Sequence, residues 1–208
     1  MTPVTTGSPY IFVYNNALDS ANCDLLNAWV AGADIATNTA YATANAWEHA
    51  ADTGSIGDAN VRSIIKTYTA ELVNVANTDF SKQLLPESSM LLYWRSNNSM
   101  QLHSDAIDFG NVSPDHANTI PNNASIYMRE VTSITFTNDS FSGGEVTIQV
   151  EPRGANTLTY TVTPTKGTVV MFDSHCLFSV NTVTSAANSM ITLPIYFTTN
   201  ANAAQILP

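Results

Sequence analysis

His103 and Asp105 are separated by a single residue, and they follow a segment that is expected to form a β-strand. Because side chains two positions apart on a strand point to the same face, an imidazole and a carboxylate would converge there. Such a pair supplies half of a mononuclear metal site, and a second His from a distant strand would complete a two-His, one-carboxylate set suited to Fe(II). The ordinary alternative for this short pattern is a surface His beside an acid.

The other histidines and the cysteines form weaker patterns. His116 falls in a polar stretch, SPDHAN, which favours an exposed loop, and His49 has no second ligand at metal spacing in a segment expected to be a helix or turn. Cys176 neighbours His175, but adjacent residues on a strand point to opposite faces, which disfavours a catalytic pair. Cys23 and Cys176 are far apart in the sequence, which indicates two buried thiols in a reducing compartment rather than a disulfide framework.

Two predicted helices near the N-terminus precede the region that carries the His-x-Asp pattern. Asp19 or Ser20 can cap a helix over 19–32, in which apolar residues recur at helical spacing. Asp58 can cap a second helix over 58–77, whose Val, Ile, Tyr and Leu residues share one face.

The rest of the chain is predicted to form strands. A first strand is expected at 10–14, and from about residue 90 onward short runs rich in Val, Ile, Thr and Tyr alternate with turn residues. These runs are MLLYW, SIYMREVTSITFTN, GEVTIQV, LTYTVTP, GTVVMF and MITLPIYF. The sequence therefore predicts a mainly β protein with N-terminal helices, in which the strands form a sandwich or jelly roll. One domain is expected over 1–208, helical at about 1–85 and β-rich at about 86–208.

The composition disfavours several classes of partner and location. Seven Lys and Arg against 17 Asp and Glu give a formal net charge of −10, and no basic run is present. This argues against nucleic acid and anionic membranes as partners. No apolar stretch approaches the roughly 20 residues of a membrane span, and the N-terminus lacks the pattern of a signal peptide. We therefore expect a cytoplasmic protein or part of an assembled particle, not secretion by a signal peptide.

Longer motifs accompany the His-x-Asp pattern in a characteristic order. Tyr93 lies ten residues before His103, and REVTSITFTNDSFSGGE places Arg129 at the start of a strand that leads to a Gly-Gly-Glu segment. VTPTKGTVVMF follows, and PYIFVYNNALDSANCDLLNAW lies near the N-terminus. These motifs resemble the prolyl 4-hydroxylase-type 2-oxoglutarate/Fe(II) dioxygenases over nearly the whole chain. The resemblance implies a double-stranded β-helix, a jelly roll flanked by N-terminal helices.

The resemblance implies that His103 and Asp105 are two of three Fe(II) ligands. The third ligand of the family is a His after the Phe-ended strand, and an ungapped alignment places Phe178 at that position. His175 lies three residues earlier, and a bulge or loop could aim it at the metal. The candidate metal ligands are therefore His103 and Asp105, together with His175 if a bulge or loop aims it at the metal; otherwise Phe178 has replaced the third ligand.

The resemblance also implies 2-oxoglutarate as cosubstrate, with its far carboxylate bound by an Arg or Lys downstream of the third ligand. In this chain the corresponding stretch is SAANSMITLPIYF, with Asn188 at or near the position, and Lys166 is the last basic residue. A charge-assisted contact orients a carboxylate, so its loss is expected to weaken cosubstrate binding. The remaining candidates for cosubstrate contacts are Tyr93, Arg129 and Asn188.

Two functions are consistent with these patterns. Changes at two chemically required positions favour a degenerate oxygenase-fold protein without a cofactor, used as a binding or assembly subunit. Charged residues make up only 12% of the chain, and this Asn-, Thr- and Ala-rich composition resembles that of virion or other particle subunits, so protein partners and an oligomer are expected. The alternative is an active Fe(II)- and 2-oxoglutarate-dependent, prolyl-hydroxylase-like dioxygenase, with iron held by His103, Asp105 and His175.

Overall fold

The computed structural model of the chain describes residues 1, 3–32, 49–106, 129–150, 157–184, 189–202 and 204. Along these residues the elements run β1, β2, α1, β3 and α2, with a short 3-10 turn before α2, and continue as strands β4 to β11. The described part of the protein is therefore mostly β with two helices, as predicted.

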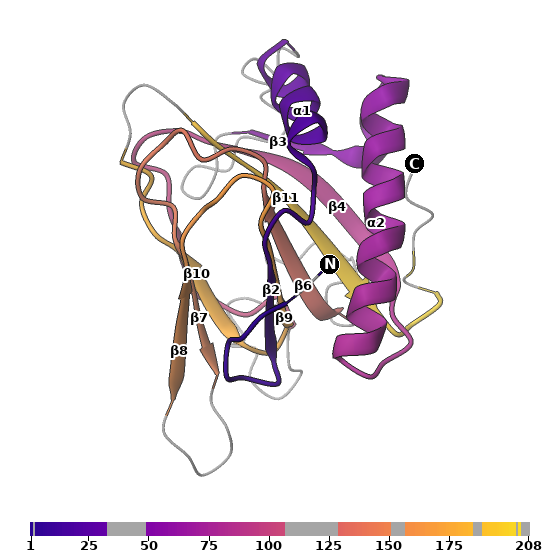
Figure 1. Ribbon diagram of the computed structural model, residues 1–208, viewed down its shortest axis with the longest axis vertical. Helices are drawn as coiled ribbons and strands as arrows, with labels where there is room; N and C mark the ends of the chain where they lie inside the picture. The colour runs from indigo at the N-terminus through magenta and orange to yellow at the C-terminus, as the bar shows by residue number, and fades with distance from the viewer. Residues whose placement is uncertain are drawn as a thin grey trace, which may run out of the picture.

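Two antiparallel sheets form the body of the fold (Figure 1). The larger sheet has seven strands in the order β1 (Pro3–Val4), β2 (Ile11–Tyr14), β9 (Val169–Asp173), β6 (Arg129–Phe136), β11 (Met190–Thr198), β4 (Leu85–Trp94) and β3 (His49–Asp52). The smaller sheet has four strands in the order β5 (Met100–His103), β10 (Leu177–Val180), β7 (Val146–Val150) and β8 (Leu158–Val162). The chain passes repeatedly from one sheet to the other between β4 and β11, which is the jelly roll, or double-stranded β-helix, predicted from the sequence.

The two helices cover the outer face of the larger sheet (Figure 1). They are α1 (Ser20–Gly32) and α2 (Ala59–Asp79), close to the predicted bounds. The Asp58 carboxylate accepts hydrogen bonds from the backbone N–H groups of Asn60 and Val61, so Asp58 is the N-cap of α2 that the sequence predicts.

Two hydrophobic clusters lie on opposite faces of the larger sheet. The helix-side cluster joins the helices to this sheet and includes Leu26, Ile65, Leu72, Leu91, Leu193 and Phe197. The barrel cluster lies between the two sheets and includes Leu92, Trp94, Ile134, Phe136, Ile148, Phe172 and Phe178. In β4, Leu91 and Tyr93 face the helices, whereas Leu92 and Trp94 face the barrel, as the two-residue period of a strand requires.

The N-terminal part differs from the sequence-based prediction in one respect. His49 lies in β3, where it pairs with Tyr93 at the edge of the larger sheet, and not in a helix or turn. Pairing with β4 outweighs the weak strand preference of its Ala-containing segment. Cys23 and Cys176 are both free and buried, as predicted. Neither described helix has the length and apolar character needed to cross a lipid bilayer.

Candidate functional site

The imidazole of His103 and the carboxylate of Asp105 meet at the end of β5. Nε2 of His103 lies 3.7 Å from Oδ1 of Asp105, so the convergence predicted from their spacing is present. Nδ1 of His103 is 2.8 Å from the carbonyl oxygen of Gln101, which can only accept a hydrogen bond, so Nδ1 carries a proton and donates it. In the neutral ring the free lone pair of Nε2 therefore faces Asp105, a tautomer that also suits a metal ligand.

The surroundings of His103 raise the pKa of its imidazole. Burial of the ring by itself lowers this pKa, because the charged form loses hydration. Interaction with the Asp105 carboxylate and the hydrogen bond to the Gln101 carbonyl stabilise the protonated ring and outweigh the effect of burial. When His103 is protonated, it therefore forms a stabilising ion pair with Asp105.

Asp105 is held in place from β6 and from the turn after β9. It is only 8% exposed, and its Oδ2 accepts a hydrogen bond from the hydroxyl of Thr132 at 2.8 Å. The Thr132 oxygen in turn lies 2.9 Å from the hydroxyl of Ser174. The backbone N–H of Ala106 donates to the Ser174 carbonyl at 2.9 Å, which ties the segment after Asp105 to the same turn. The carboxylate is thus oriented, with Oδ1 directed to His103.

Arg129, the first residue of β6, brings a cation to the same region. Its Nε donates to Oε2 of Glu87 at 2.8 Å, and its Nη1 lies 3.9 Å from Oδ1 of Asp105. Its guanidinium carbon lies 3.5 Å from the ring centroid of Tyr196. Glu87 is 2% exposed and was not singled out from the sequence, where its only signal is an acidic residue within a strand. Two carboxylates therefore balance the charge of Arg129 before any ligand binds.

Phe178 occupies the position opposite His103. The two residues are direct partners in the register of β10 with β5, and their ring centroids lie 4.4 Å apart. Phe178 is 3% exposed and also packs against Phe172, at 4.9 Å between ring centroids. The inward orientation predicted for Phe178 is confirmed. The place from which β10 could complete a metal site is therefore filled by a side chain that has no donor atom.

His175 lies in the turn before β10. Its side chain is 60% exposed, and its Nδ1 lies 2.9 Å from Oδ1 of Asp173. Within the described part of the chain, no three His, Cys, Asp or Glu side chains come together as a group that could hold a metal ion. One imidazole and one carboxylate do not fit the three-ligand site of a non-haem Fe(II) enzyme.

Of the remaining predicted cosubstrate contacts, the structure describes Tyr93, which is not brought to this pair. Tyr93 packs against the helix-side cluster, so its side chain lies on the face of the larger sheet that is turned away from the barrel. The neighbouring Trp94 fills the barrel, where its Nε1 donates to the hydroxyl of Thr192 at 3.0 Å. Asn188 and His116 lie outside the described residues.

A small cavity lies between the described side chains of the barrel interior. Side chains from both sheets leave a cavity of about 20 Å³, lined by residues that include Trp94, Phe136, Phe178 and Tyr196. This is room for about one water molecule. The residues that line this cavity do not include His103, Asp105 or Arg129.

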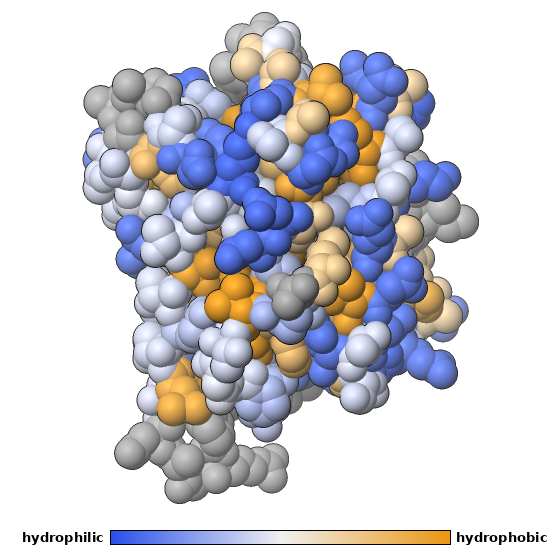
Figure 2. All heavy atoms as spheres, in the orientation of Figure 1, coloured by the Kyte–Doolittle hydropathy of each residue, from blue (hydrophilic) through white to orange (hydrophobic). Residues whose placement is uncertain are grey.

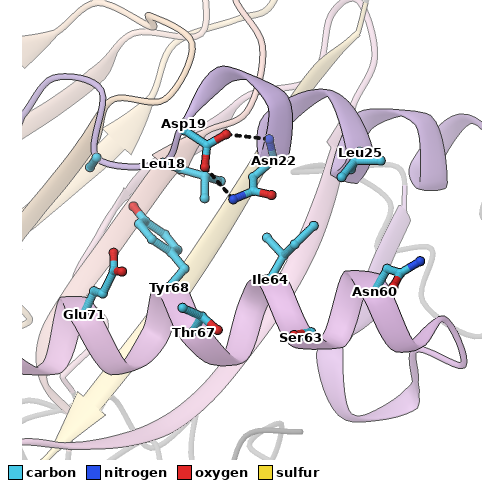
Figure 3. A pocket seen from close by; sticks show the side chains of 11 residues that line it. Leu18, Asp19, Asn22, Leu25, Asn60, Ser63, Ile64, Thr67, Tyr68 and Glu71 are labelled. Carbon is cyan, nitrogen blue, oxygen red and sulfur yellow. Dashed lines mark hydrogen bonds between the residues drawn. The ribbon is translucent and has the colours of Figure 1, made fainter.

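A larger hollow lies between the two helices, on the other side of the larger sheet (Figure 3). Its volume is about 380 Å³, and the side chains of Ile64 and Tyr68 on α2 extend toward α1 across it. The carboxylate of Asp19 at its rim is engaged with the backbone and side-chain amides of Asn22. The larger sheet separates this hollow from the His-Asp pair, so the two features are independent.

Comparison with known proteins bears on the fold. No family model matches the sequence, and no curated protein sequence matches it. The crystal structure of a Pseudomonas putida prolyl 4-hydroxylase is similar, with a TM-score of 0.67 at 13% identity over 92% of this chain and 93% of that chain. A viral collagen prolyl hydroxylase from Paramecium bursaria Chlorella virus-1 has a TM-score of 0.60 at 17% identity, over 92% of this chain and 96% of the other.

A third similar structure is an oxidoreductase of the 2OG-Fe(II) oxygenase family from Burkholderia pseudomallei. Its TM-score is 0.61 at 14% identity, and the likeness covers 94% of this chain and 87% of that chain. In all three cases the likeness extends over nearly the whole of both chains, and at these identities it concerns the fold.

Proposed function

We propose that this chain, which has the fold of the prolyl 4-hydroxylase-like 2-oxoglutarate/Fe(II) oxygenases, is a non-catalytic protein that binds protein partners as a subunit of a larger assembly. In this proposal the jelly roll is retained as a rigid scaffold. At the positions that would bind iron and cosubstrate, the residues have been replaced or make contacts within the chain instead.

The observation that carries the proposal is the pairing of Phe178 with His103. A metal bound by His103 and Asp105 needs at least one more protein ligand for a facial triad. The strand that would supply this ligand, β10, presents the phenyl ring of Phe178. The centroid of this ring lies 4.4 Å from the centroid of the His103 imidazole. An ion held by one imidazole and one carboxylate is expected to bind weakly, so the pair serves the stability of the barrel.

Two further observations support the absence of a cosubstrate. The guanidinium of Arg129 lies 3.9 Å from Asp105, and Glu87 and Asp105 already balance its charge. A buried carboxylate that lacks its own cation costs several kcal/mol. The cavity of about 20 Å³ beside Phe178 and Trp94 is far smaller than this anion.

An active dioxygenase is the second candidate, and one observation favours it. The lone pair of His103 Nε2 faces Asp105, while Nδ1–H donates to a backbone carbonyl, as in a metal-ligating imidazole. This candidate requires a third ligand, for which His175 is the residue proposed from the sequence. His175 would have to leave its hydrogen bond to Asp173 and reach the pair.

Calorimetric titration of the purified chain with Co(II) and then with 2-oxoglutarate tests the proposal. We expect no saturable binding of 2-oxoglutarate in the presence of Co(II), because the described His-Asp pair lacks a third metal ligand and the cation beside it, Arg129, is already paired with Glu87 and Asp105. An active prolyl 4-hydroxylase titrated in the same buffer is the positive control. Stoichiometric, Co(II)-dependent binding of 2-oxoglutarate would overturn the proposal and favour the enzyme.

A further inference from the structure

Four described strands lie at sheet edges, and three of them carry features that discourage pairing with another chain. β1 has only two residues and begins with Pro3, and β3 contains Asp52. β5 pairs with β10 through a shift in register. Short length, proline, charge and bulges are the devices by which natural sheets protect their edges.

β8 (Leu158–Val162) has none of these features. Its five residues, LTYTV, contain no charge and no proline. They pair with β7 in unbroken register, from Val162 opposite Val146 to Leu158 opposite Val150. Among the described strands β8 pairs with β7 alone, so no described strand takes up the backbone N–H and C=O groups of its other edge. Figure 1 shows β8 at the outer margin of the smaller sheet, and Leu158 is 52% exposed.

The charge distribution favours a second copy of this chain as that partner. None of the four strands of the smaller sheet contains Asp, Glu, Lys or Arg, although the whole chain has a net charge of −10. In Figure 2 the margin where β8 lies is pale with an orange area near its lower end, whereas hydrophilic residues gather over the helices. Two acidic copies repel each other least when they meet at an uncharged edge.

We propose that two copies of the chain associate by antiparallel pairing of β8 with β8 across a two-fold axis. The axis lies at Tyr160, the central residue of the strand, because this register overlaps all five residues. It places Thr159 opposite Thr161 of the second copy, and it joins the two smaller sheets into one continuous sheet. A strand added to a free edge is a common mode of protein recognition, and such isologous pairing closes as a dimer.

This inference deepens the proposed function, because it names one partner of the assembly subunit, and it rests on that function for its biological role. The dimer itself does not depend on whether iron or 2-oxoglutarate binds. A monomeric protein would defeat the inference and leave the non-catalytic proposal intact. Turnover of 2-oxoglutarate by a dimeric protein would overturn the non-catalytic proposal and leave the inferred dimer intact.

Sedimentation equilibrium of the purified chain over a range of concentrations is the first test. We expect a reversible dimer. The double variant Thr159→Glu/Thr161→Glu places like charges directly opposite each other across the axis, and we expect at least about tenfold weaker dimerisation. The double variant Thr67→Glu/Thr78→Glu adds the same charge to exposed positions of α2, and it should remain a dimer.

Cysteine cross-linking tests the register. Residues directly opposite each other on antiparallel strands are close enough for a disulfide, so Tyr160→Cys should form a covalent dimer under mild oxidation. The parent chain is the control, because Cys23 and Cys176 are buried and should give none. Circular dichroism verifies that each variant is folded. A monomeric parent chain, or a dimer that persists in Thr159→Glu/Thr161→Glu, would overturn the proposal.

Discussion

Phe178 faces His103 across the pair of strands β10 and β5, with 4.4 Å between the centroids of their rings. The imidazole is thereby packed against a hydrocarbon surface on one side and directed to Asp105, 3.7 Å away, on the other. The ring of Phe178 belongs to the barrel cluster. The predictions below follow from this contact and its surroundings.

Restoring a ligand at position 178 should create metal affinity. Loss of the outer partners of a metal-bound His costs about 10- to 100-fold in affinity, and a directly coordinating His contributes at least as much. We therefore expect Phe178→His to bind Co(II) at least about tenfold more tightly than the parent chain, measured by calorimetry. Phe178→Leu removes the same aromatic ring without adding a donor, and it should leave Co(II) binding unchanged.

The same titration with Co(II) tests whether His175 is a metal ligand. His175 is exposed and hydrogen-bonded to Asp173, so His175→Ala should not alter the weak Co(II) binding of the parent chain. If His175→Ala weakens Co(II) binding more than Phe178→His strengthens it, His175 is the third ligand, and the account of Phe178 as its replacement is wrong.

The pair formed by His103 and Asp105 should make stability depend on pH. The pKa of His103 is raised above its ordinary value of 6.5 in the folded chain, so folding favours the protonated ring. The stabilisation is fully present below the ordinary value and is lost as the pH rises through the raised pKa. Urea unfolding of the parent chain and of His103→Gln should therefore differ most at acidic pH. A difference that grows as the pH rises would contradict this assignment.

Arg129 should contribute to stability through the carboxylates that it balances. Arg129→Met leaves Glu87, which is 2% exposed, without its cation. Loss of one partner of a buried pair typically costs about 3–5 kcal/mol, and we expect a loss of that order in the free energy of unfolding, measured in urea. Arg129→Met/Glu87→Leu should recover much of it. A loss below about 1 kcal/mol, the range of exposed ion pairs, would show that the pair is effectively solvated.

The two cysteines should be inert in the folded protein. Burial raises the pKa of the Cys23 thiol to about 11 and that of Cys176 to about 12, so neither forms a thiolate near neutral pH. A thiol reagent should modify neither residue in the native chain and both in urea. Rapid reaction of one thiol in the native chain would show that the structure around this thiol opens to solvent.

Much of the fold could be predicted because local patterns and motif order agree. Helical spacing and the Asp58 cap indicated α2, and the run of strand segments indicated a jelly roll. The resemblance to prolyl 4-hydroxylases, confirmed at the level of the fold, aligned Phe178 with the third ligand. The inward orientation of Phe178 could be predicted because the spacing between Phe172 and Phe178 determines which residue of β10 meets β5.

The contacts of the site were less predictable, because they depend on which face each residue occupies. A shift of one residue along β4 exchanges Tyr93 for Trp94 in the barrel, and the sequence does not reveal this choice. Glu87 and Arg129 meet only because β4 and β6 flank β11 in the larger sheet. An ion pair between strands that are distant in the sequence cannot be recognised from the local spacing of residues.

Release of succinate from 2-oxoglutarate is the most direct test of the central claim that this oxygenase fold is non-catalytic. The purified chain would be incubated with Fe(II), ascorbate and 2-oxoglutarate, with and without candidate peptides, beside an active prolyl 4-hydroxylase as control. We predict no succinate above the background of reactions without protein, because a phenyl ring without a donor atom faces His103 and Arg129 is already paired. Sustained, iron-dependent release of succinate would contradict the account.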